Sequence, residues 1–177
     1  PLSRRVITAY GDDSVQKLTE LHFVIKNASN ILTKKLQWGR LAAYLEQSTR
    51  YIYFDKKNPD GTFKYHTPSV LDSTTKQQYI GQMDELFARY AKLVAGLTQH
   101  VRANSNEPEA QRDGAWKAAT RAQACDAARL VLPAATTSTV GIYASGQALE
   151  SLIMHLQSDE LAEARAVGDD ILTEARK

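Results

Sequence analysis

The longest regular pattern in the chain lies between residues 73 and 102, where apolar side chains recur at spacings of three and four. That spacing places them on one face of a helix and predicts a long amphipathic α-helix. The helix is expected to end at the polar loop of residues 103–108, because Pro108 cannot continue it. Such a stripe usually packs into a core, and the alternative, a helical surface for protein interaction, stays open. The stripe consists of Tyr79, Ile80, Met83, Leu86, Phe87, Tyr90, Leu93, Val94, Leu97 and Val101.

The first part of the chain shows shorter patterns. Residues 11–14, with the sequence Gly-Asp-Asp-Ser, predict a turn. Residues 21–25 alternate with a period of two, which predicts a short half-buried strand. Ser29 is a suitable N-cap for a helix that continues through Leu41, with Gly39 late in that helix.

Extended structure is expected after this helix. Residues 43–55 are rich in Tyr, Ile, Thr and Phe, which favour extended chain. Residues 58–61, with the sequence Asn-Pro-Asp-Gly, predict a tight turn of the hairpin kind.

The second half of the chain reads as mainly helical. One helix is predicted over residues 114–132 and is stopped by Pro133. A polar stretch at residues 136–146 leads into a last helix, which Gly168 breaks or kinks. The sequence therefore predicts a single α+β domain over residues 1–177, mostly helical, with a small antiparallel sheet.

Composition limits the class of protein. The chain has 177 residues, of which 43% are hydrophobic and 24% charged, the balance of one compact soluble domain. Its net charge is only +2 and its basic residues do not gather in a run, so we expect no binding to nucleic acid. It has no apolar run of the ~20 residues that a membrane span needs and no signal-peptide pattern, so we expect a cytoplasmic protein without membrane association.

The thiol and imidazole groups do not suggest a metal site. Cys125 is the single cysteine, so it cannot form an internal disulfide, and its alanine-rich helical surroundings favour a place in the core. The four histidines lack the spacing of ligands on one helix face, and we expect no metal ion. A chain that starts at Pro1 has either lost an initiator Met or is a piece of a longer, for example tandem, chain, and both alternatives stay open.

One short segment is rich in chemical groups. If residues 46–51 are extended, Glu46, Ser48 and Arg50 point to the same side. A guanidinium, a hydroxyl and a carboxylate together suit a phosphorylated polar ligand. The alternative is a solvent-facing strand with a Glu–Arg pair, which contributes less than about 1 kcal/mol.

At this segment the sequence resembles the flavin-dependent thymidylate synthase family, whose motif reads R-H-R-x-x-S and then x-[NS]-x-x-S-x-R-Y. Arg40, Ser48, Arg50 and Tyr51 match it, and Glu46 lies where many members carry a glutamate. Two further blocks agree in order. Residues 11–14 resemble the family's G-H-[DE]-S, and residues 128–133 resemble its R-x-L-L-P element.

The departures from the family pattern fall mainly on groups that hold FAD. In the motif, Trp38, Gly39 and Ala43 replace Arg, His and Ser. Residues 145–148, with the sequence Ser-Gly-Gln-Ala, replace the family's N-x-R-S, and Leu156 stands where a later arginine faces the nucleotide base. In the early block, the replaced positions are Asp12, Lys17 and Leu18.

The resemblance implies methylation of dUMP to dTMP. The family takes carbon from methylenetetrahydrofolate, uses FAD for hydride and NADPH to reduce the flavin, and has its active sites between the subunits of a homotetramer. By position, the implied dUMP contacts are Glu46, Ser48, Arg50 and Arg129, and the remaining flavin contacts are Arg40 and Gln147. The catalytic residues stay unassigned, because chemistry in this family rests on the bound flavin, so that positions that orient the flavin ring matter more than any acid or base.

Beside the helical interaction protein considered above, two functions within this family are weighed. The first is an active enzyme of this family. The alternative is a catalytically degenerate domain of the same fold that serves as a nucleotide-binding or structural partner, because most flavin-contacting positions are replaced.

Overall fold

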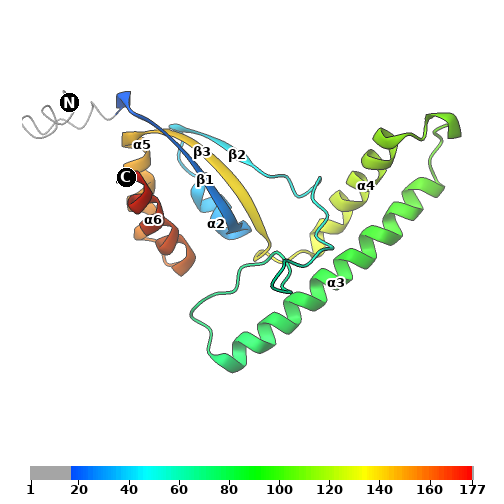
Figure 1. Cartoon of the computed structure of the whole chain (residues 1–177), viewed down its shortest axis with the longest axis horizontal. Coiled ribbons are helices and arrows are strands. Elements are labelled where there is room, and N and C mark those ends of the chain that lie inside the picture. Colours follow the sequence, from blue (N-terminus) through cyan, green and yellow to red (C-terminus); the bar gives the residue numbers. More distant parts are fainter. Residues whose placement is uncertain (1–16, 177) are drawn as a thin grey trace, which may run out of the picture. The chain divides into compact units, whose positions relative to one another are not determined.

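The structure, a computed structural model, describes residues 17–176. It is mostly helical with one small antiparallel sheet, which confirms the predicted fold class (Figure 1). The chain divides into two compact units, each with its own core. Within the described residues, unit 1 comprises residues 17–47, 68–70 and 138–176, and unit 2 comprises Ser48–Thr67 and Leu71–Thr137. The predicted turn at residues 11–14 lies outside the described residues.

The sheet has three strands, β1 (Glu20–Ser29), β2 (Ala42–Glu46) and β3 (Thr137–Ser145), in the order β1-β3-β2. Strand β2 pairs antiparallel with β3, so that Ala42 lies opposite Ala144 and Glu46 opposite Val140. Strand β1 confirms the alternation at residues 21–25, because Leu21, Phe23 and Ile25 pack against the core of unit 1 while Val24 is exposed. Each outer strand therefore depends on β3 for its hydrogen bonds.

The central strand β3 is the element that the sequence analysis missed. It occupies the stretch interpreted only as a polar lead into the last helix. Val140, Ile142 and Ala144 alternate along it and are buried, while the buried Ser138 hydroxyl donates to the Gln47 carbonyl at 3.0 Å. The polar side chains near its start are thus bonded within the fold, which lets a Thr- and Ser-rich segment lie at the centre of a sheet.

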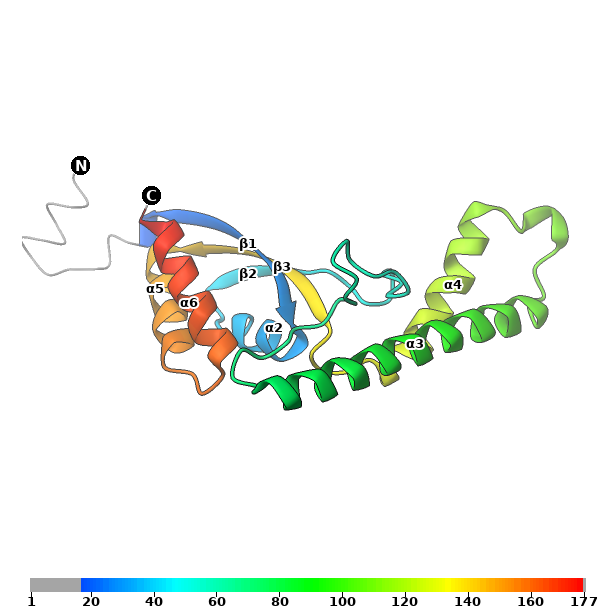
Figure 2. The same cartoon turned by 60° about the horizontal axis from the view of Figure 1, so that its bottom comes forward.

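Three helices cover one face of the sheet, namely α2 (Asn30–Leu36), α5 (Gly146–Gln157) and α6 (Ala162–Ala175) (Figure 2). Ser29 caps α2 as predicted, because its hydroxyl accepts from the Leu32 amide at 3.1 Å. The helix ends at Leu36, so the predicted continuation is wrong, and Leu41 is 79% exposed. The fully buried side chains of this core include Leu32, Leu36, Val140 and Leu156.

The last helical region is broken earlier than expected. The chain leaves α5 after Gln157 and begins α6 at Ala162, whereas Gly168 lies inside α6. Gly168 is buried and faces Leu156, which explains a small residue there better than a kink does.

Unit 2 contains α3 (Ser73–Ala103) and α4 (Gly114–Ala128). The bounds of α3 confirm the long helix, and Phe87, Tyr90 and Val94 of its stripe are buried. Helix α4 ends earlier than predicted, and a 3₁₀ turn at Arg129–Val131 follows it. The stripe packs on aromatic side chains and on α4, which favours the core interpretation over an interaction surface. The buried members of this core are Phe54, Phe63, Tyr65, Phe87, Tyr90, Val94, Ala124, Cys125 and Ala128.

The turn at residues 58–61 is present, but it joins irregular segments. The Gly61 amide donates to the Asn58 carbonyl at 2.9 Å, and the Asn58 amide donates to the Thr62 carbonyl at 2.7 Å. Gly61 has φ of 83°, a conformation that favours glycine. No strand borders the turn within residues 17–176, so the hairpin expectation is wrong.

None of the helices within residues 17–176 has both the length and the hydrophobicity for a membrane span.

Candidate functional site

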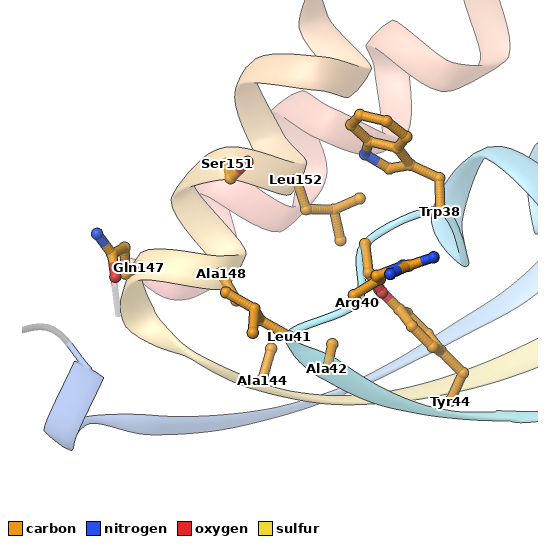
Figure 3. Close-up of a pocket in the computed structure, with 11 residues that line it drawn as sticks. Trp38, Arg40, Leu41, Ala42, Tyr44, Ala144, Gln147, Ala148, Ser151 and Leu152 are labelled. Carbon is orange, nitrogen blue, oxygen red and sulfur yellow. The ribbon is translucent and has the colours of Figure 1, made fainter.

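A cavity of about 620 Å³ lies in unit 1, between the segment that follows α2 and the first turns of α5 (Figure 3). Its volume falls within the range of small-molecule sites. Apolar side chains form most of its wall, and Arg40, Gln147 and Ser151 add polar groups. Such a lining suits a flat, largely apolar ligand with a few hydrogen-bonding groups.

Local structure fixes both walls of the cavity. Ser145 ends β3 and caps α5, because its hydroxyl accepts from the Ala148 amide at 3.3 Å. This places Gln147 in the first turn of α5 and Ser151 one turn later on the same face. On the other wall, the Tyr44 hydroxyl donates to the Gly39 carbonyl at 2.9 Å and holds the segment beside it. Burial raises the pKa of Tyr44, so the hydroxyl keeps its proton at neutral pH.

Trp38 extends the aromatic part of the wall. Its ring stacks on that of His155, with centroids 4.6 Å apart and planes inclined by 21°. The family motif has an arginine at this position, so the indole offers a flat face where a charge would stand. The motif comparison treated Trp38 as a loss, whereas the structure places it in the lining of the cavity.

The two residues assigned to the flavin by their motif positions line this one cavity. Arg40 comes from the segment after α2 and Gln147 from the start of α5 (Figure 3). Sequence analysis did not identify Tyr44 or Ser151. The spacing of Ser151 four residues after Gln147 is a signal that could have found it, whereas the position of Tyr44 depends on the pairing of β2 with β3.

Among the residues assigned to dUMP, Glu46 lies in unit 1 at the end of β2. Its carboxylate accepts from the Gln37 side-chain amide at 2.7 Å and from the Lys34 ammonium at 3.0 Å. Burial opposes the ionisation of Glu46, but the hydrogen bonds from Gln37 and Lys34 outweigh it and hold the pKa of this carboxyl below its usual value. Glu46 is therefore ionised at neutral pH.

Strand β2 ends at Glu46, so the argument from strand alternation does not extend to Ser48 and Arg50. These two residues lie in unit 2, in a turn where the Ser48 hydroxyl accepts from the Arg50 amide at 3.3 Å. The alternative of a Glu46–Arg50 pair along one strand loses its basis for the same reason. Instead, Glu46 forms an ion pair with Lys34 in unit 1, and Arg50 forms an ion pair with Asp126 in unit 2.

The structure does bring Arg50 and Arg129 together. The Nε of Arg50 and the Nη2 of Arg129 each lie 3.0 Å from the same oxygen, Oδ1 of Asp126. Two guanidinium groups with partly exposed side chains thus converge on one carboxylate.

Within residues 17–176, no group of three or more His, Cys, Asp or Glu side chains is arranged to hold a metal ion.

Two relatives match almost the whole of this chain in sequence. The chain is 34% identical over 175 residues to a UPF0159 protein from Chlamydia pneumoniae, with 98% of this chain and 33% of that protein covered. A UPF0159 protein from Chlamydia muridarum is 33% identical over 176 residues, again with 98% and 33% covered. The chain therefore spans about a third of the length of these relatives.

A third relative carries a functional name. The flavin-dependent thymidylate synthase of Clostridium tetani is 24% identical over 176 residues, with 97% of this chain and 64% of that protein covered. This likeness agrees with the resemblance found at the E-x-S-x-R-Y segment. Because the sequence model of the thymidylate synthase complementing protein family matches residues 2–177, the chain belongs to that family.

Proposed function

We propose that the chain forms part of a flavin-dependent thymidylate synthase, which methylates dUMP to dTMP with methylenetetrahydrofolate and NADPH. The observation that supports this most directly is that Arg40 and Gln147 both belong to the lining of one cavity. Their positions in two separate motif blocks had assigned them to the same cofactor. Two blocks far apart in sequence thus contribute to one small-molecule site.

The lining of the cavity fits the ring system of a flavin. Trp38 and Leu152 give it flat and apolar walls, while Gln147 and Ser151 offer hydrogen-bonding groups for the polar edge of a heteroaromatic ring. Arg40 is the single cation among the lining residues and would face an anionic part of the cofactor. When bound, the flavin would supply the hydride for the reaction. The lining residues would hold the ring and orient it.

For dUMP, the proposal assigns the phosphate to Arg50 and Arg129. Planar guanidinium groups recognise phosphate oxygens through pairs of charge-assisted hydrogen bonds. The convergence of both arginines on one carboxylate supports this assignment, because it shows that both reach the same point. Glu46 and Ser48 stay predicted contacts to the nucleotide.

Flavin binding is the first test. Purified protein is incubated with excess FAD, desalted and measured by visible absorption, and we expect near-stoichiometric retention. Arg40→Met and Gln147→Leu are expected to reduce retention, whereas Arg89→Met, on the exposed surface of α3, serves as the matched control. The retained complex is then given dUMP, methylenetetrahydrofolate and NADPH, and absence of dTMP would contradict the proposal.

Assembly and location are further parts of this proposal, supported by family membership. We infer a homotetramer with active sites between subunits, acting in the cytoplasm. Light scattering of the purified protein is expected to give the mass of four chains, and a monomer under assay conditions would contradict this inference.

A second candidate function is a degenerate domain of the same fold that binds nucleotide without catalysis. Leu156, at the position of the base-facing arginine of the family, is fully buried in the core of unit 1 and presents no polar group. This candidate predicts dUMP binding without flavin retention and without dTMP formation. Stoichiometric FAD binding by this chain alone would exclude it.

A further inference from the structure

In unit 2, the guanidinium groups of two arginines contact the same carboxylate oxygen. Oδ1 of Asp126 lies 3.0 Å from Nε of Arg50 and 3.0 Å from Nη2 of Arg129. The side chains are 53% exposed for Arg50 and 40% exposed for Asp126 and for Arg129. Solvent, and therefore a small ligand, can reach all three groups.

The backbone holds two residues of this cluster of Arg50, Asp126 and Arg129 more firmly than the third. Asp126 lies on α4, and Arg129 follows it by three residues in the 3₁₀ turn, so both stand on regular structure. Arg50 lies in an irregular turn and has a long side chain with many rotamers. The hydrogen bond to Asp126 ties this side chain to the end of α4, where Arg129 is.

Two guanidinium groups repel each other when they converge, and a carboxylate between them offsets that repulsion. Each guanidinium has five N–H donors, and the contacts to Asp126 use Nε of Arg50 and Nη2 of Arg129. Further donors on both groups remain available for the oxygens of an incoming anion. The cluster therefore has the form of a preassembled pair of arginines rather than of a closed ion pair.

We propose that Asp126 is a positioning residue, which holds Arg50 and Arg129 together so that they bind the phosphate of a nucleoside monophosphate. The inference rests on the proposed function, in which these arginines contact dUMP. Ordering Arg50 before the ligand arrives reduces the conformational entropy that binding must remove. Asp126 acts through the arginines and does not itself contact the nucleotide.

The experiment compares dUMP with deoxyuridine, which lacks the phosphate, by isothermal titration of the full 177-residue chain. Asp126→Ala is expected to weaken dUMP binding up to about tenfold, the size of the entropy cost of ordering one long side chain, and to leave deoxyuridine binding unchanged. Asp126→Asn keeps an oxygen acceptor for the guanidinium groups but loses the charge that offsets their repulsion, so we expect a dUMP affinity between those of Asp126→Ala and the native chain. Asp126→Ser serves as a second truncation.

The matched control is Glu85→Ala, which removes the partner of Arg89 in an exposed ion pair on α3 and is expected to change neither affinity. Melting temperatures of all variants are expected to stay near that of the native chain, because the cluster is half exposed.

Several results would overturn the inference. Unchanged or tighter dUMP binding by Asp126→Ala would show that Asp126 is indifferent or competes with the phosphate, while the proposed function would stand. Equal weakening of dUMP and deoxyuridine would show a structural role only. A native chain that does not bind dUMP, or that binds deoxyuridine equally well, would overturn the proposed dUMP contacts and this inference together.

Discussion

The hydrogen atom that serves as the side chain of Gly168 allows α6 to lie close to α5. A Cβ atom at this position would lie 3.0 Å from Cβ of Leu156 and 3.2 Å from Cγ of Gln157. The Gln157 side chain can move, but Leu156 is fully buried. The close contact therefore explains a glycine in the interior of a helix, where it otherwise destabilises.

Gly168→Ala is expected to lower the free energy of unfolding by about 1–3 kcal/mol through overpacking. Urea denaturation measures this change. Gly96→Ala is the matched control, since Gly96 lies in the interior of α3 with nothing within 4 Å of an added Cβ. That change is expected to stabilise the chain by about 0.4–1 kcal/mol. Equal stability of the two variants would show that α5 and α6 separate at little cost.

Arg50→Lys tests ligand contact at the same scale. Lysine keeps the charge but lacks the planar fork, so dUMP binding is expected to weaken by about tenfold, with little change in melting temperature. Titration with dUMP and a thermal melt are the two measurements, with Arg89→Lys as the control for an exposed arginine. A lower melting temperature with unchanged dUMP affinity would show that Arg50 has a structural role instead.

Only part of the candidate site could be read from the sequence. Arg40 and Gln147 were found because they occupy motif positions. Tyr44 and Asp126 were missed because no spacing pattern marks their contacts. Tyr44 bonds Gly39, five residues earlier, in a segment without helix or strand periodicity, and Asp126 bonds Arg50 across 76 residues. Trp38 was noted only as a replacement, because a motif comparison does not show that an aromatic side chain can line the same cavity.

At the scale of elements, Asp72 determines where α3 begins. Its carboxylate accepts from the amides of Thr74 and Thr75 at 3.0 Å each and from the Thr75 hydroxyl at 2.6 Å. The hydrogen bond from the Thr75 hydroxyl and those from the amides hold the pKa of Asp72 below its usual value. The cap therefore stabilises the folded state most when Asp72 is ionised.

Asp72→Asn keeps a capping oxygen but loses the charge, so we expect a lower melting temperature at neutral pH. A lowered folded-state pKa gives stability that is present above the unfolded pKa and lost as the pH falls through the folded pKa. The difference in melting temperature is therefore expected to disappear at acid pH. Thermal melts over a pH series measure it, and a difference that stays constant with pH would contradict the role of the charge.

The elements differed in how readily the sequence revealed them. Helix α3 was predicted almost to its ends because its stripe repeats over many turns. Strand β3 was missed because its Thr, Ser and Gly residues suggested a loop, although Val140, Ile142 and Ala144 alternate as in a half-buried strand. The break before α6 was placed at Gly168, whereas Asp159 marks it, because its carboxylate accepts from the Leu161 amide at 2.8 Å.

At the scale of the whole molecule, most of unit 2 lies in the sequence between β2 and β3 of unit 1. A chain that ends at residue 136 lacks the central strand, so β1 and β2 have no partner to bond. We expect such a chain to show fast amide exchange in both strands, in contrast to the full chain. Hydrogen exchange measured by mass spectrometry tests this, and slow exchange in β1 of the shortened chain would contradict the observed strand order.

The order β1-β3-β2 also determines when the sheet can form during synthesis of the chain. About 90 residues separate the end of β2 from the start of β3, which corresponds to roughly 5–20 s of translation. During that interval both outer strands are already made, yet the strand that joins them is absent. The unpaired edges of these strands can bond to other chains. A high concentration of nascent chains, or slow translation of residues 47–136, therefore favours aggregation over folding.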